Sequence, residues 1–179
     1  MEHEALEKLK YPVGKFSKPE AYTADLIETW KLTISDFPSK LKNEVTGLSE
    51  SQLDTPYRPG GWTVRQVVHH CGDSHMNAFI RFKLALTEDK PTVKAYEEQF
   101  WAEQADYKLP IEISLNLITP LHFRWSTLLN SLTTADFESR YIHPQTGNEL
   151  DLYYMLGLYD WHCRHHLSHI TELIKRSGW

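Results

Sequence analysis

The sequence predicts an all-α protein, a four-helix bundle that forms a single domain over residues 1–179. Apolar residues recur every three or four positions in four long segments, which is the period of a helix with one buried face. No segment shows a convincing alternation of apolar and polar residues, the pattern of a strand. The chain is long enough for one domain with a sizeable core. Four amphipathic helices bury their apolar faces most simply against one another.

The N-terminal segment, residues 1–20, is expected to be an extended arm that lies on the domain. Pro12 and Pro19 lie within it and disfavour regular structure. The first long helix follows over residues 22–47, where the helical spacing of apolar residues begins. Pro38 lies inside this segment. Proline removes a hydrogen bond and clashes with the preceding turn, so we expect a kink or two separate pieces.

The next helix starts are marked by capping boxes. Ser49 and Thr63 are each followed three residues later by a glutamine, which predicts a short turn after the first and a long helix after the second. Residues 54–61 hold two prolines and two glycines and are expected to form a loop. The second long helix is predicted over residues 64–86.

The rest of the chain contains two further long helices. An irregular segment with a short aromatic-rich helix at 96–101 precedes the third long helix, predicted over 113–132 and disturbed by Pro120. Residues 133–147 form a connection that ends in a turn. The fourth long helix is predicted over 149–176, because its apolar residues keep helical spacing throughout.

Composition excludes several classes of protein. The formal net charge of −5 argues against a nucleic-acid partner, which usually meets a basic patch. Two cysteines are too few for a disulfide framework. No apolar run approaches the length of a membrane span, and the charged N-terminus does not resemble a signal peptide. We therefore expect a cytoplasmic protein without a membrane partner.

Four of the ten histidines fall within the fourth helix, and this helix is the strongest functional signal. His162, His165, His166 and His169 share one helical stripe. The apolar residues of the helix place His166 and His162 nearest the core, at the i, i+4 spacing from which two imidazoles reach one metal ion. His165 and His169 have the same spacing on a face expected to be wetter. The simpler alternative is that all four are surface residues.

The second helix offers two candidates for a third ligand. His75 faces its main apolar stripe, whereas His70 lies at the edge of that stripe in a polar row with Ser74, Asn77 and Arg81. Such a row is either solvated surface or the lining of a polar cavity. Periodicity does not choose between the two histidines. His122, in the third helix, is expected to be structural or exposed.

Several stretches resemble a known family. They are Gln52-Leu-Asp-Thr-Pro-Tyr-Arg-x-Gly-Gly-Trp-Thr-Val-Arg-Gln-Val-Val-His-His70, Asp73-Ser-His-Met-Asn77, Arg81-Phe-Lys, Trp161-His-x-x-x-His166, and the terminal Gly178-Trp179. They are similar to the DinB-like superfamily and, more narrowly, to its YfiT-type metal-dependent hydrolases. The resemblance implies a four-helix bundle and a divalent metal held by His70, His162 and His166. Cys71-Gly72 departs from the family pattern of an apolar and a small residue, and a helical glycine costs about 1 kcal/mol relative to alanine.

Three histidine ligands imply an open metal site, with zinc the first expectation and nickel the second. Such a metal activates water for hydrolysis of a small-molecule substrate. A bound low-molecular-weight thiol would instead make the protein an S-transferase. A non-catalytic metal-binding stress-response protein is a further alternative. Asn77 and Arg81 are candidates for holding an anionic substrate, and a homodimer is expected, for which Met76, Ile80 and Leu84 offer an apolar strip.

Overall fold

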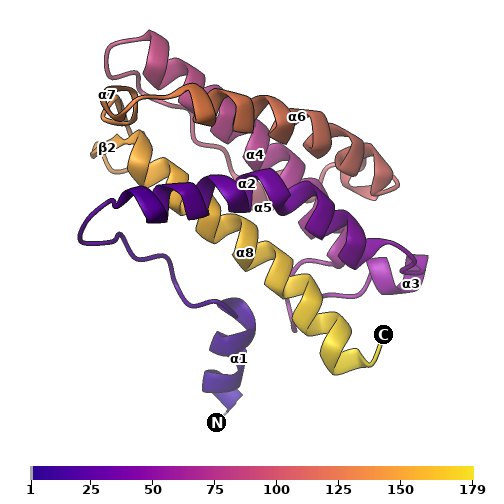
Figure 1. The fold of residues 1–179 in the computed structure, drawn as a ribbon. Coiled ribbons are helices and arrows are strands. Elements are labelled where there is room, and N and C mark those ends of the chain that lie inside the picture. Colours follow the sequence, from indigo (N-terminus) through magenta and orange to yellow (C-terminus); the bar gives the residue numbers. More distant parts are fainter. Residues whose placement is uncertain (1) are drawn as a thin grey trace.

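Four long helices lie side by side in the computed structural model, which describes residues 2–179 (Figure 1). They are α2 (Ala24–Val45), α4 (Val64–Thr87), α6 (Glu112–Ser131) and α8 (Leu152–Ser177). α2 packs against α6 and α8, and α4 packs against the same two helices. The predicted four-helix bundle is confirmed.

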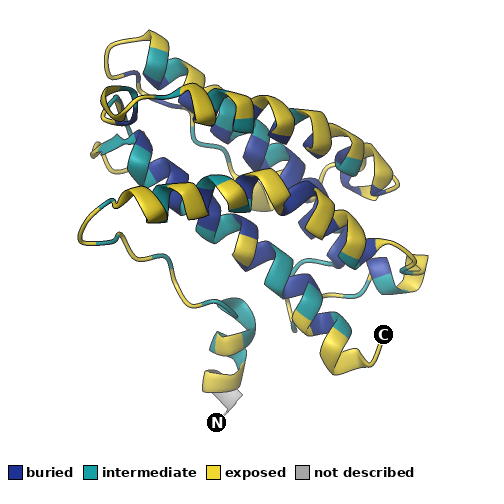
Figure 2. Ribbon diagram, viewed as in Figure 1, coloured by how far each residue is buried: buried dark blue, intermediate teal, exposed yellow. Residues whose placement is uncertain are grey.

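The core lies between these helices, and their outer faces are exposed (Figure 2). The largest fully buried side chains include Ile34, Leu41, Phe82, Trp125 and Leu156, which come from all four long helices. Each such side chain stabilises the fold by about 1.5–3 kcal/mol relative to leaving it in water. His75 is the polar member of this set of largest fully buried side chains, and it has no exposed surface. No helix within residues 2–179 is long and apolar enough to cross a bilayer.

Both predicted capping boxes are present. Thr63 Oγ1 accepts a hydrogen bond from the backbone N–H of Gln66, and the Gln66 side chain accepts one from the backbone N–H of Thr63. Ser49 and Gln52 do the same for the short helix α3 (Glu50–Leu53). These reciprocal bonds satisfy backbone donors that a helix start leaves free, which is why α4 begins where the sequence indicates.

Pro38 lies inside α2 and does not divide it, so the expectation of two pieces is wrong. α6 is likewise continuous across Pro120. Packing explains the continuity of α2, because Phe37 and Leu41 on either side of the proline are buried in the core. The carbonyl oxygen of Ile34, which the missing N–H of Pro38 would have contacted, accepts a hydrogen bond from another helix.

The N-terminal segment differs from the extended arm that we expected. Helix α1 spans Glu2–Lys10, and only the residues after it are extended. Its sequence favours a helix through good helix formers and through ion pairs one turn apart, such as Lys10 with Glu7 at 3.0 Å. The extended residues lie along α8: the Gly14 carbonyl accepts from Trp161 Nε1, and the Phe16 ring packs on Tyr154.

The connection before α8 contains a small antiparallel hairpin that sequence reasoning missed. Strand β1 (Arg140–Ile142) pairs with β2 (Glu149–Asp151), with Tyr141 opposite Leu150. α8 therefore begins at Leu152, after an Asp151 side chain that caps it. Three further short elements, α5 (Glu98–Trp101), the 3₁₀-helix η1 (Ala105–Lys108) and α7 (Thr134–Phe137), complete the chain. Three-residue strands leave too little alternation to recognise.

Candidate metal centre

Three histidine side chains from two helices converge between α4 and α8. His70 belongs to α4, and His162 and His166 lie one turn apart in α8. Each offers a ring nitrogen within 4.8 Å of those of the other two. The Nε2 atoms of His70 and His162 are 3.2 Å apart, and the ring centroids of His162 and His166 are 4.4 Å apart. The i, i+4 spacing aligns the α8 pair, and helix packing brings His70 to it.

Burial keeps these imidazoles neutral. Desolvation, with a smaller contribution from His165, lowers the pKa of His70 from 6.5 to about 3. Desolvation and then the neighbouring histidines lower the pKa of His162 and of His166 well below 6.5. Within the described residues, Nδ1 of His70 and Nδ1 of His166 are buried without a hydrogen-bond partner. Neutral, closely spaced imidazoles are the donor set that a divalent cation of the zinc type requires, so the residues fit such an ion.

His165 and His169 are also buried, which corrects the expectation of a wetter face. The N-terminal segment covers them. His169 Nε2 donates to the Lys10 carbonyl at 3.0 Å, and the Tyr11 ring lies 5.9 Å from the His165 ring. Lys10 is 159 residues distant in sequence from His169, so helical periodicity could not reveal this cover. With His166, these two histidines form a second group whose ring nitrogens lie within 4.8 Å of one another.

His75 and His122 lie behind the first group, in the core. His75 has no exposed surface, and its Nε2 atom is 3.1 Å from Nδ1 of His162. His122 is 1% exposed, so of the two readings of this residue the structural one is correct. The helix face of His75 was read correctly from periodicity, but its partners on two other helices were not visible in the sequence.

A cavity of about 620 Å³ opens beside the three histidines. His70, His162 and His166 all line it. Aromatic rings form much of the remaining wall, among them Trp62, whose ring centroid lies 4.6 Å from that of His70. A space of this size accommodates a small-molecule ligand.

The charged side chains that line the cavity are mostly cationic. Lys10, Arg58 and Arg81 carry positive charge, and Glu98 is the one carboxylate among the lining residues that the structure describes. The Nε atoms of both arginines are buried, and neither has a hydrogen-bond partner in the described part of the chain. Sequence reasoning singled out Arg81 but missed Arg58, although Arg58 lies in the loop before α4 that carries the family motif.

The two predicted substrate-binding residues are placed differently. Arg81 lines the cavity and donates through Nη2 to the Lys94 carbonyl at 2.6 Å. Asn77 donates to the Asp73 carbonyl of its own helix and is absent from the described lining of the cavity. The polar row of α4 therefore divides: His70, Ser74 and Arg81 line the cavity, whereas Asn77 does not belong to its described lining.

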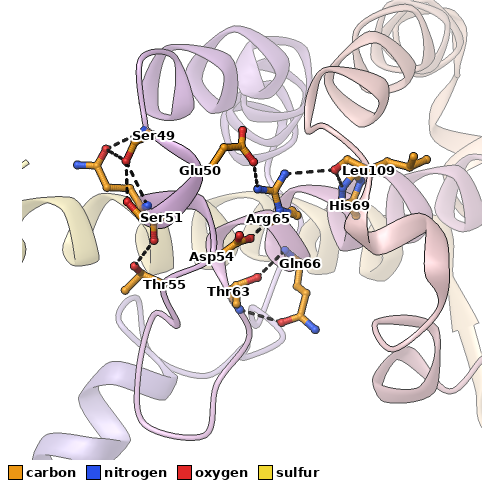
Figure 3. Close-up of polar contacts among 11 residues, drawn as sticks. Ser49, Glu50, Ser51, Asp54, Thr55, Thr63, Arg65, Gln66, His69 and Leu109 are labelled. Carbon is orange, nitrogen blue, oxygen red and sulfur yellow. Dashed lines mark hydrogen bonds and ion pairs between the residues drawn. The ribbon is translucent and has the colours of Figure 1, made fainter.

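Arg65 ties the loop that carries Arg58 to the start of α4 (Figure 3). Its guanidinium donates to Asp54 at 2.7 Å and to Glu50 at 2.5 Å, and it also reaches the Leu109 carbonyl at 3.3 Å. The planar fork of arginine suits several acceptors at once. This network fixes both ends of the loop on which Arg58 and Trp62 approach the cavity.

Several known proteins are similar to this chain over nearly its whole length. Two relatives, from Bacillus cereus and Bacillus anthracis, are each named "putative metal-dependent hydrolase" and are 52% identical over 174 residues, covering 97% of this chain and 100% of the relative. The solved structure of YfiT from Bacillus subtilis, described as a "probable metal-dependent hydrolase with an unusual four-helix bundle topology", has 47% identity and a TM-score of 0.93. The match covers 96% of this chain and 99% of the YfiT chain.

The model of the DinB superfamily matches residues 34–170, a span that runs from α2 into α8 and includes His70, His162 and His166. The resemblance first noticed around His70 and in the α8 motif thus extends over the bundle, and the chain belongs to the DinB superfamily.

Proposed function

We propose that this protein is a metal-dependent hydrolase that holds one divalent cation with His70, His162 and His166. The observation that carries the proposal is the convergence of these neutral imidazoles on the wall of a cavity large enough for a substrate. The names of the relatives support the same class of activity. Zinc is the first candidate and nickel the second, because three imidazoles suit both and leave coordination positions open.

A divalent cation held there by His70, His162 and His166 would supply Lewis acidity, which would acidify a water molecule or polarise a substrate carbonyl. The chain's own groups position the substrate. Ser74 Oγ lies 3.2 Å from His162 Nε2 and 3.3 Å from the Tyr159 hydroxyl, so it can donate to a substrate oxygen beside the histidines. Burial raises the pKa of Tyr159, which keeps this phenol protonated, and its O–H donates to the Ser74 carbonyl at 3.1 Å.

We further propose that the substrate is anionic. Arg58 and Arg81 both line the cavity, and their positively charged guanidinium groups would attract an anion bound there. Lys10 adds a third positive charge, against the single carboxylate of Glu98 in the described lining. Asn77 is not part of this proposal, because its amide is engaged within α4.

A thiol S-transferase is the alternative activity. The chain does not supply the thiolate from its own cysteines, because burial raises the pKa of both Cys71 and Cys163. A transferase would therefore need a free low-molecular-weight thiol as second substrate. Hydrolysis of anionic esters and amides without added thiol supports the hydrolase, whereas turnover only with a thiol supports the transferase.

The metal site is tested by metal content, measured by mass spectrometry on untagged protein purified without nickel resin. We expect a stoichiometric divalent metal in the wild type and its loss in His166→Ala. Because His166 belongs to both histidine groups, two further variants separate them. His70→Ala should lose the metal, while His169→Gln should keep it. Retention in His70→Ala with loss in His169→Gln would place the metal in the second group and contradict the proposal.

A further inference from the structure

A chain of hydrogen bonds connects the proposed ligand His162 to the backbone of α2. His162 Nδ1 lies 3.1 Å from His75 Nε2, and His75 Nδ1 lies 2.8 Å from His122 Nε2. His122 Nδ1 lies 2.6 Å from the carbonyl oxygen of Ile34. The four members belong to α8, α4, α6 and α2 in that order, so each long helix of the bundle contributes one.

Pro38 accounts for the end of this chain. In a helix without proline, the Ile34 carbonyl would accept a hydrogen bond from the backbone N–H of residue 38. Pro38 has no such N–H. The Ile34 oxygen is therefore available to His122, and the bond between them is short. A carbonyl oxygen only accepts, so His122 must carry its proton on Nδ1.

That single constraint sets every proton in the chain. A neutral imidazole has one N–H and one bare nitrogen, so His122 with Nδ1–H accepts through Nε2. His75 must then donate from Nδ1 and accept at Nε2, and His162 in turn must donate from Nδ1. The Nε2 atom of His162 is left bare, and this atom faces Nε2 of His70 at 3.2 Å.

The surroundings of the chain favour the neutral state that this reasoning requires. Phe37 packs on both His75 and His122, with ring centroids at 4.9 and 5.5 Å, and Trp125 lies within 6.2 Å of both. Desolvation lowers the pKa of His122 from 6.5 to about 4 and that of His75 well below 6.5. Besides these two bonds, the ring of Tyr159 and Sγ of Cys163, at 3.9 Å, also face His75.

We propose that His75 and His122 are positioning residues that hold His162 in its Nδ1–H tautomer and so keep Nε2 bare for the metal. The inference rests on the proposed function, because it assumes that His162 is a ligand. Reversing the tautomer of His162 would require reversing all three imidazoles. His122 would then present a bare Nδ1 to the Ile34 oxygen, two acceptors in contact in a buried site. The fold of all four helices thus selects the metal-binding form of the ligand.

The first test uses the metal-free wild type with ¹⁵N-labelled histidine. Long-range ¹⁵N–¹H correlation spectra report which ring nitrogen of each histidine carries the proton. We expect Nδ1–H with bare Nε2 for His122, His75 and His162. An Nε2–H tautomer of His162 would overturn the proposal. The measurement needs no bound metal, so its outcome is independent of whether the metal-site proposal holds.

The second test measures zinc affinity by competition with a chelator in variants of His122, which touches none of the three proposed ligands. His122→Phe keeps an aromatic ring but removes the acceptor for His75, and we expect affinity to fall about 10- to 100-fold, as loss of an outer hydrogen-bond partner does. His122→Gln can both donate to Ile34 and accept from His75, and should recover most of the affinity.

The control is His69→Phe in α4. It also removes a buried imidazole, but one that bonds to Ser114 and to the Leu109 carbonyl and takes no part in the histidine chain. Its zinc affinity should match the wild type. A folded His122→Phe that binds zinc as tightly as the wild type would contradict the proposal. If His122→Phe does not fold, the tautomers of the wild-type histidines and the zinc affinity of His122→Gln decide whether the proposal holds. Absence of zinc binding by the wild type would instead refute the metal-site proposal while the tautomers still test the chain.

Discussion

A tight contact between two helices of the bundle predicts the effect of a single methyl group. Gly157 of α8 faces Trp30 of α2, and a Cβ built on Gly157 would lie 2.7, 2.9 and 3.0 Å from three carbons of the Trp30 ring. Cβ atoms essentially never approach other heavy atoms this closely. Trp30 is 6% exposed and also packs on Tyr22, so its ring has little room to move. Gly157→Ala should therefore force the two helices apart.

The magnitude follows from two opposing contributions. Overpacking a well-filled core costs about 1–3 kcal/mol, and contacts with a rigid ring place this site near the upper limit. Alanine regains about 1 kcal/mol of helix propensity over glycine. We expect Gly157→Ala to lower the free energy of unfolding by about 2 kcal/mol. Gly72 of α4 is the matched control, because its nearest neighbours to a built Cβ are Ser114 and Leu117 atoms at 3.5–3.7 Å. Without a clash, Gly72→Ala should raise the free energy of unfolding by about 0.5–1 kcal/mol.

Urea unfolding followed by circular dichroism measures both changes, with a chelator present so that metal binding does not add to stability. For a slope of about 2 kcal/mol per molar urea, the midpoint of Gly157→Ala should fall by about 1 M, while that of Gly72→Ala should rise. The two substitutions are chemically identical and both lie inside helices, so opposite signs isolate the tertiary contact. A Gly157→Ala variant as stable as the wild type would refute the close packing of α2 on α8.

Three further predictions concern ionisable side chains. Because burial lowers the pKa of His122 from 6.5 to about 4, its neutral form stabilises the fold fully above pH 6.5, and this contribution is lost as the pH falls toward 4. The free energy of unfolding, measured in urea across this pH range, should rise less steeply with pH in His122→Gln than in the wild type, by up to about 1.4 kcal/mol per pH unit. Equal slopes in the two proteins would contradict this prediction. Arg65→Lys, which loses the fork joining Glu50 and Asp54, should lower the free energy of unfolding by about 1–2 kcal/mol in the same assay, whereas Lys40→Ala, from an exposed pair with Asp36, should change it by less than about 0.5. Finally, Arg81→Ala should weaken binding of inorganic phosphate about tenfold or more by calorimetry, and Asn77→Ala should leave it unchanged. Equal effects of these two substitutions would count against an anion site in the cavity.

The sequence by itself determined the long helices and most of their ends. Apolar spacing located all four, because a helix that buries one face must repeat every three to four residues. Thr63 and Ser49 marked helix starts through bonds to residues three positions later, which are local and therefore readable. The pairing of His162 with His166 was predictable for the same reason, since one turn of helix joins them.

Only the tertiary structure decided what meets those helices from elsewhere in the chain. Periodicity shows which face of a helix points inward but not which residue of another helix it touches. His75 was recognised as inward-facing, yet its bonds to His122 and His162 depend on how three helices pack. The cover over His165 and His169 comes from the opposite end of the chain. From the sequence, Pro38 is expected to break a helix. In the structure it only leaves the Ile34 carbonyl without its helical N–H, and the packing of the bundle brings His122 to donate to that carbonyl.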